Sequence, residues 1–215
     1  MSSVLRPWVR GALALRQAAL LGALLLAACA TTRPPAPPAA LPPAAAAPWE
    51  QRVADLQSWT EWNLAGRAAV AYGKQGWQAS LAWTQSGSVS DLHLAGPLGL
   101  GASELTLTPG GLAVNGGPPN PDVLNQLENK LGFPLPIAAL RYWLLGVPEP
   151  GSAVTVTRND GDRAEQWSQA DWLVEIDRYM PVEGDVLPAH LVLTHEDVRI
   201  RIVVEHWHVP GAAGD

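Results

Sequence analysis

The chain has 215 residues, of which 47% are hydrophobic and 16% are charged, and its net charge is −6. This length suits one domain with additional segments, and the apolar fraction is sufficient for a core. Without residues 1–28, which hold three arginines and no acidic residue, 11 basic and 20 acidic residues remain, a net charge of −9. Nucleic-acid binding needs clustered Lys and Arg, so we expect no nucleic-acid partner. The one cysteine, Cys29, excludes an internal disulfide and a zinc site built from cysteines.

Residues 1–28 have the organisation of an export signal. Three arginines precede an unbroken apolar run over residues 18–28, which is shorter than the about 20 residues that a membrane-spanning helix needs. The run ends in Ala27-Ala28-Cys29, which resembles the lipobox of bacterial lipoproteins, where the thiol accepts a diacylglycerol. We therefore predict a lipoprotein signal peptide at 1–28 and a Cys29 that carries a diacylglycerol and an N-acyl chain. Several acyl chains anchor a protein firmly, because each buried CH₂ contributes about 0.8 kcal/mol.

The segment 29–48 is rich in Pro and Ala and has almost nothing to bury, so it does not fold alone. Pro-rich chains favour an extended conformation at about 3.1 Å per residue, and we expect a passive tether that reaches about 50–60 Å. Ala30 follows Cys29. In the Gram-negative sorting rule, an Asp at that position retains a lipoprotein in the inner membrane. Its absence predicts a lipid anchor in the outer membrane, with the folded part facing the periplasm.

After residue 48 the pattern becomes that of a folded domain, which we place at 49–209, with a flexible tail at 210–215. A helix is predicted near 48–58, and a series of strands follows it. The clearest strand is 77–84, in which apolar residues occupy every second position. The other strands of this first series are predicted at 64–72, 91–94, 104–108 and 112–115.

Two helices interrupt the strands. The first begins near Pro121 and ends at Gly132, and the second follows Pro136 and is closed by Gly146, since Gly and Pro mark helix ends. Few strand pairs enclose a helix, so we predict an antiparallel α+β domain. A meander this long curls or closes, and side chains, helices or a ligand must fill its concave face; the pattern does not select one of these. The later strands are predicted at 154–156, 172–177, 191–193 and 198–209, with Asp160-Gly161 as a hairpin turn.

The sequence offers little that points to catalysis or to a metal. His206 and His208 share one face of the last strand, but no third ligand lies at a matching spacing. No catalytic or nucleotide-binding motif is found, so we predict neither an enzyme, nor a metal site, nor a cofactor. The most unusual feature is the connection Gly96–Gly101, which holds Leu98 and Leu100 among turn residues. These leucines either fold back into the core or form an exposed apolar tip, and the pattern alone leaves both open.

Several fragments, in order, resemble the LolB family of outer-membrane lipoprotein receptors over nearly all of residues 49–208. The most specific fragment is Leu140–Pro148, with the pattern L-x-x-W-[IL]-L-G-x-P. The chain departs from the family at Ile176, where the family often has Tyr. The other matching fragments are Gly66-Arg67-Ala68, Trp83-Thr84-Gln85, Pro97-Leu98-Gly99, Leu131–Pro136, Trp172 with Val174, Tyr179, Leu187-Pro188 and Trp207.

The resemblance implies a strongly curved antiparallel sheet of about 10–11 strands, an incomplete barrel, with helices as a lid over an apolar cavity. A receptor of this kind accepts lipoproteins from the periplasmic carrier LolA, holds their acyl chains in the cavity and inserts them into the inner leaflet of the outer membrane. It needs no cofactor, and we expect a monomer. Inward-facing residues of the strands and helices would line the cavity. The candidates are Trp77, Leu81, Trp83, Leu140, Trp143, Leu144, Trp172, Val174 and Ile176.

The family also places an exposed leucine in a protruding loop that delivers cargo to the membrane. Pro97-Leu98-Gly99 matches this motif, so Leu98 is the candidate tip, but the loop is longer here and Leu100 is a second candidate. Two other interpretations stay open. One is a lipoprotein of the same fold that binds a different lipid or hydrophobe, and the other is a non-catalytic structural lipoprotein of the outer membrane.

Overall fold

One antiparallel sheet dominates the described part of the protein, which is residues 49–96, 101–158 and 163–210 of a computed structural model. Its strands are β1 (Glu61–Tyr72), β2 (Gln75–Ser86), β3 (Val89–Ala95), β4 (Ser103–Thr108), β5 (Gly111–Val114), β6 (Thr155–Arg158), β7 (Ala164–Gln169), β8 (Trp172–Val182), β9 (Asp185–His195) and β10 (Val198–His208). Their order in the sheet is β5-β4-β3-β2-β1-β10-β9-β8-β7-β6. Because β5 and β6 lie at opposite ends of this order, the sheet is open and is not a closed barrel. The predicted antiparallel α+β fold is confirmed.

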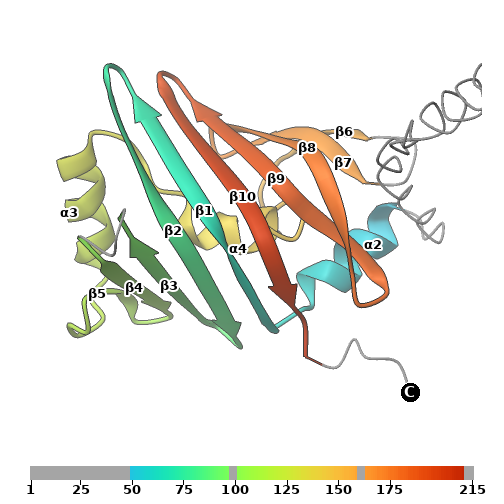
Figure 1. Ribbon diagram of the computed structural model, residues 1–215, viewed down its shortest axis with the longest axis horizontal. Helices are drawn as coiled ribbons and strands as arrows, with labels where there is room; N and C mark the ends of the chain where they lie inside the picture. Colours follow the sequence, from blue (N-terminus) through green and yellow to red (C-terminus); the bar gives the residue numbers. More distant parts are fainter. Residues whose placement is uncertain (1–48, 97–100, 159–162, 211–215) are drawn as a thin grey trace, which may run out of the picture. The chain divides into compact units, whose positions relative to one another are not determined.

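Three helices accompany the sheet within the described residues, namely α2 (Trp49–Gln57), α3 (Asp122–Leu131) and α4 (Ile137–Trp143). Figure 1 shows α3 beside β5, α4 behind the central strands, and α2 near the hairpin of β8 and β9. Helix α3 ends at Gly132, whose φ of 84° is left-handed and whose N–H donates to the carbonyl of Glu128. None of these helices is long and apolar enough to cross a membrane.

Alternation along the strands gives the sheet one buried face and one exposed face. In β2, buried residues alternate with exposed ones from Ala79 onward. β1 and most of β10 alternate in the same way, so the inner face supplies the core. The core residues in the described part of the chain lie between Trp49 and Val209, inside the compact unit Leu41–Asp215. This unit therefore carries its own core.

The half of the sheet formed by β7, β8 and β9 packs against α4 and the turn that follows it. Trp143 is fully buried, and its Nε1 donates to Gln169 Oε1 over 2.8 Å. The same side-chain amide bonds both backbone groups of Glu149, accepting its N–H at 2.9 Å and donating to its carbonyl at 2.8 Å. Gln169 is itself buried, so these bonds satisfy groups that would otherwise lose their water without compensation.

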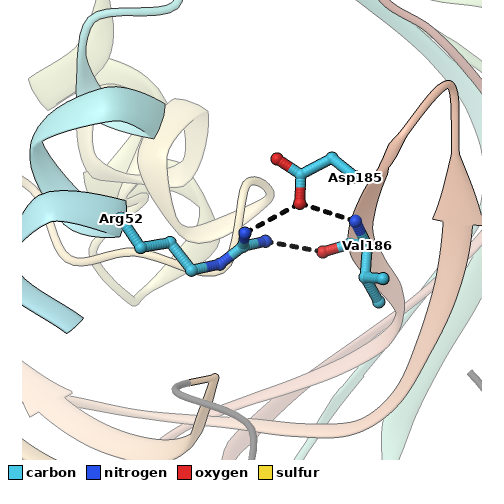
Figure 2. Close-up of polar contacts among 3 residues, drawn as sticks. All are labelled: Arg52, Asp185 and Val186. Carbon is cyan, nitrogen blue, oxygen red and sulfur yellow. Dashed lines mark hydrogen bonds and ion pairs between the residues drawn. The ribbon is translucent and has the colours of Figure 1, made fainter. Parts of the chain in front are cut away.

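Arg52 fastens α2 to the start of β9. Its Nη1 lies 2.7 Å from Asp185 Oδ1, and its Nη2 donates to the carbonyl of Val186 over 2.7 Å (Figure 2). The same Asp185 oxygen accepts the backbone N–H of Val186 at 2.6 Å. The side chains of Arg52 and Asp185 are 15% and 28% exposed, so this ion pair is screened less than one in open solvent. The contact holds the first helix of the described fold in place.

Each helix and strand expected from the sequence has a counterpart in the structure, but the pattern does not predict β7. This strand reads Ala-Glu-Gln-Trp-Ser-Gln, and its buried positions include the polar Gln169. A buried glutamine hides the strand from a search for alternating apolar residues. The predicted turn Asp160-Gly161 lies outside the described residues.

Candidate functional site

An apolar cavity of about 550 Å³ lies between the inner face of one half of the sheet and the two helices α3 and α4. Residues of β1 to β5 and of β10 form its wall on the sheet side. Apart from Gln78 and Ser103, the residues around it are apolar or are glycines. The lining consists of Ala68, Val70, Trp77, Gln78, Ala79, Leu81, Leu92, Leu94, Gly96, Gly101, Ser103, Leu105, Val114, Leu127, Leu131, Phe133, Leu135, Pro136, Ile137, Leu140, Ile200 and Ile202.

Small side chains on the central strands leave this space open. Ala68 of β1 and Ala79 of β2 pair directly across the two strands, and both point into the cavity. Side chains of this size cannot reach the helices opposite, whereas protein cores are normally filled without voids larger than a water molecule. The sequence therefore builds the hollow by placing alanine where a larger residue would close it.

The helical side of the cavity is only loosely covered. Helix α3 has no buried residue, and Leu127 and Leu131 of this helix are half-buried and line the cavity. Phe133, just after the helix, packs against the ring of Tyr72 at 5.6 Å between centroids. The backbone N–H of Leu135 donates to Glu128 Oε1 over 2.8 Å, which fixes the segment between α3 and α4. Because the apolar face of α3 is only half-buried, a ligand bound in the cavity could bury more of it.

One end of the cavity opens at the edge of β2. Strand β3 pairs with β2 over Ser80–Ser86, so within the part of the chain that the structure describes, residues 75–79 of β2 pair only with β1. Trp77 lies at this point, lines the cavity and is 48% exposed. Gly96 and Gly101 line the cavity as well, and they flank residues 97–100, which lie outside the described residues. We call Trp77, Gly96 and Gly101 the mouth of the cavity.

The structure divides the nine candidate lining residues into two groups. Trp77, Leu81 and Leu140 line the cavity. The other six belong to the tightly packed core and are not part of its lining; they are Trp83, Trp143, Leu144, Trp172, Val174 and Ile176. The strand residues of both groups lie on the inner face of the sheet, and Leu140, Trp143 and Leu144 belong to α4 and its C-terminal end. The second group lies where large side chains fill the space. Whether any of the nine contacts a ligand stays a prediction.

The sequence pattern predicts in part which other residues line the cavity. Ala68, Ala79 and Val70 occupy the inward positions of the central strands, which alternation identifies. Leu127 and Leu131 stand on the apolar face of α3. Their assignment to a cavity depends on how far the helices stand from the sheet, which no local pattern records.

The histidines of the last strand lie on the outer face, away from the cavity. His206 and His208 are exposed, and His208 Nδ1 lies 3.8 Å from a carboxylate oxygen of Glu183. Within residues 49–96, 101–158 and 163–210, no group of three or more His, Cys, Asp or Glu is arranged to hold a metal ion. Cys29, Pro97, Leu98, Gly99 and Leu100 lie outside the described residues.

These features define a class of protein, in which an open antiparallel sheet holds an apolar cavity beneath helices. Residues 60–207 match the family model described as outer membrane lipoprotein LolB. The chain therefore belongs to the LolB family of outer-membrane lipoproteins, and the family resemblance found in its sequence is confirmed.

The chain is also similar in sequence to several proteins named outer-membrane lipoprotein LolB. The outer-membrane lipoprotein LolB of Nitrosococcus oceani is 34% identical over 166 residues, which cover 75% of this chain and 83% of that protein. LolB of Pseudomonas putida is 33% identical and covers 74% of this chain, and LolB of Pseudomonas savastanoi is 31% identical and covers 75%; each match spans 80% of the relative. A LolA superfamily protein of Nitrosomonas europaea has a solved structure that is 6% identical in sequence, with a TM-score of 0.49 over 76% of this chain and 94% of that chain.

Proposed function

We propose that this lipoprotein accepts other lipoproteins from a LolA-like periplasmic carrier, binds their acyl chains in the apolar cavity and inserts them into the outer membrane. Membership of the LolB family supports the pathway. The cavity of about 550 Å³, with its apolar lining, is the observation that carries the proposal. Its size lies within the range of about 300–1,000 Å³ that small-molecule sites occupy.

An acyl chain needs no specific polar partner in such a cavity. Each buried CH₂ group contributes about 0.8 kcal/mol, so affinity grows with the length of chain that is covered. Burial of the acyl chain is also favourable in the carrier and in the bilayer. The direction of transfer therefore depends on the differences in free energy between the carrier, this protein and the bilayer. No covalent step is required, and the proposal includes neither an enzyme activity nor a cofactor.

The proposal also includes the anchor. Cys29 carries the lipid, residues 29–48 are the tether, and the domain 49–209 faces the periplasm from the inner leaflet of the outer membrane. The protein works as a monomer in this proposal. Membership of a family of outer-membrane lipoproteins supports the location.

A transfer assay tests the function. The fragment Leu41–Asp215, which contains the whole described core, is mixed with a LolA carrier loaded with a labelled lipoprotein, and crosslinking follows the label. We expect the label to move to the fragment. If the label stays on the carrier while the fragment still binds an alkyl fluorophore, the protein is a hydrophobe-binding relative with another cargo. If the folded fragment binds no alkyl fluorophore either, a structural role replaces the proposal.

Delivery to the membrane is assigned to Leu98. Gly96 and Gly101, which flank this connection, line the cavity, so a cargo chain that leaves through the mouth passes close to where the connection begins. In the full lipidated chain we expect Leu98→Glu to retain cargo acceptance but to slow release into liposomes, because a charged side chain resists entry into a bilayer. Leu100→Glu is the matched variant and decides which leucine acts. A loss of several kcal/mol in the stability of Leu98→Glu would instead make Leu98 a core residue.

A further inference from the structure

A second hollow lies on the outer face of the sheet, next to the mouth of the cavity. It runs over β10, β1 and β2, and its polar lining is Arg67, Gln78, Ser80 and Arg201; alanines, Gly96 and Val203 complete it. We call it the outer groove. Unlike the cavity, it presents two guanidinium groups to solvent.

The strand register places these groups in neighbouring rows. Arg201 of β10 pairs with Ala69 of β1, which pairs with Gln78 of β2. In the adjacent row, Val203 pairs with Arg67, which pairs with Ser80. Ala69 and Gln78 therefore lie between Arg201 and the edge of β2, and Ser80 of β2 lies directly beside Arg67.

The groove and the cavity meet at that edge. Ala68, Gln78, Ala79 and Gly96 line both hollows. Among the described residues, no strand pairs with residues 75–79 of β2 on the side away from β1, so the outer and inner faces of the sheet adjoin at this edge. A molecule with an apolar chain in the cavity can extend its polar end around β2 into the groove.

The charges of the groove fit an anion. The side chain of Arg201 is exposed and forms no hydrogen bond or ion pair within the described residues. Arg67 Nη2 lies 2.8 Å from Glu205 Oε1, but these side chains are 70% and 42% exposed, and such a pair contributes about 0–1 kcal/mol. An incoming anion can compete for Arg67. Guanidinium groups bind phosphate and carboxylate oxygens in a two-pronged geometry.

We propose that Arg67 and Arg201 bind the anionic head of an amphiphile, phosphate or carboxylate, whose acyl chain occupies the cavity. The inference rests on the proposed acyl-chain cavity and adds to it a subsite for the polar end. A lipid with a phosphate head group and a fatty acid both have this chemistry. Selection for an anionic head would let the protein hold lipid other than its lipoprotein cargo.

Single-chain amphiphiles test the proposal with the Leu41–Asp215 fragment. Decyl phosphate, decanoate and the neutral decyl glucoside share one chain length, and each displaces an alkyl-binding fluorophore below its micellar concentration. We expect the two anions to bind more tightly than the glucoside at low salt and to lose this advantage as salt screens the charges. The stronger of the two anions distinguishes a phosphate head group from a carboxylate. Inorganic phosphate alone should not displace the fluorophore, since it has no chain for the cavity.

Three variants locate the effect. Arg201→Ala should weaken the binding of decyl phosphate about three- to fivefold and leave the binding of decyl glucoside unchanged, as expected for one exposed ion pair. Arg199→Ala is the matched control, because Arg199 is exposed two residues along β10 and does not line the groove, so its affinities should match the parent's. Glu205→Gln releases Arg67 and should strengthen decyl phosphate about twofold.

Two outcomes would overturn the inference and are distinguishable. If all three amphiphiles bind equally and Arg201→Ala changes nothing, the groove takes no head group, while the cavity and the proposed function stand. If decyl glucoside and the anions all fail to bind the folded fragment, the cavity does not accept alkyl chains and both proposals fall.

Discussion

Gly66 shows how a single residue of the family pattern serves the sheet. The register between β1 and β10 shifts at Ala65 and Gly66, and the two backbones approach closely there. A Cβ atom on Gly66 would lie 2.1 Å from the carbonyl oxygen of Val203, so no side chain fits without moving a central strand. The family motif at this position therefore reflects backbone packing and not ligand contact.

We expect Gly66→Ala to lower the free energy of unfolding by about 1–3 kcal/mol, the cost of forcing extra atoms into a packed site. Urea unfolding of the Leu41–Asp215 fragment measures it. Gly110→Ala is the control, because the nearest atom to a Cβ there is 3.5 Å away, an ordinary contact. Equal stabilities of the two variants would show that β10 can move aside at the bulge.

The buried hydroxyl of Tyr179 should make the folded protein less stable in alkaline solution. Burial raises the pKa of Tyr179 above its ordinary value, and the charges of Arg52 and Arg163 oppose this only in part. Its hydroxyl donates to the carbonyl of Ala164. The folded chain therefore keeps the proton at a pH where the unfolded chain has lost it, so the contribution is complete below pH of about 10 and declines above it.

The expected slope from this residue is up to about 1.4 kcal/mol per pH unit above the ordinary tyrosine pKa. Tyr179→Phe should cost about 1 kcal/mol at pH 8, because Ala164 loses its hydrogen-bond donor, and should then lose less stability than the parent between about pH 9 and 11. Urea unfolding at a series of pH values compares the two chains. Parallel curves would mean that Tyr179 ionises equally in both states.

The limits of sequence reasoning are clear from two tryptophans of one strand. Trp77 and Trp83 lie on the same face of β2, as period-two alternation predicts, yet they differ in exposure, 48% against 1%. Trp83 stacks on Trp62 at 5.9 Å, whereas Trp77 stands at the mouth of the cavity. Alternation predicts on which face of the sheet a residue lies. What packs against that residue comes from distant parts of the chain, so alternation does not predict its exposure.

At the scale of elements, α2 depends on a polar contact as well as on its apolar face. Arg52 bonds Asp185 and the carbonyl of Val186 at the start of β9 (Figure 2). We expect Arg52→Met, which keeps much of the chain's apolar stem, to cost about 1–2 kcal/mol in urea unfolding, since Asp185 and Val186 lose a charged donor. Gln51→Met, at the exposed neighbouring position, should change stability by less than about 0.5 kcal/mol.

A double-mutant cycle separates the ion pair from the rest of the contact. Asp185→Asn removes the charge that faces Arg52, and the cycle of the two changes gives their coupling. We expect a coupling of about 1 kcal/mol that decreases with added salt, because both side chains are partly exposed. A coupling near zero would assign the stabilisation to the Val186 carbonyl alone.

Elements bounded by strong local signals are the ones that the sequence predicts. Gly132 ends α3 in a left-handed conformation, and the helix runs over Asp122–Leu131, next to the expected bounds. β7 lacks such a signal because its buried Gln169 is satisfied by Trp143 and Glu149, partners that are distant in sequence. Polar groups that are buried by long-range hydrogen bonds are invisible to a local pattern.

At the scale of the whole folded unit, buried and exposed residues alternate along the strands in both halves of the sheet. The inward-facing residues fill the core in one half and leave a cavity in the other. The half with β7, β8 and β9 is closed by large buried side chains, among them Trp143, Trp167 and Trp172. The half with β1 to β5 carries alanines at its centre and keeps an open cavity. We therefore expect the densely packed half to maintain the fold when the volume of the cavity changes.

One chemical change made in both halves tests this division. Ala79 lines the cavity, whereas Ala164 is fully buried in the packed half and does not line it. Ala79→Leu extends into open space, so we expect stability within about 1 kcal/mol of the parent and a several-fold weaker affinity for an alkyl fluorophore. Ala164→Leu meets a filled core and should cost about 1–3 kcal/mol, with unchanged affinity in the molecules that stay folded. Urea unfolding and fluorophore titration of the same samples give both quantities. An equal loss of stability in the two variants would mean that the space beside Ala79 is already filled, and the cavity could then not receive an acyl chain.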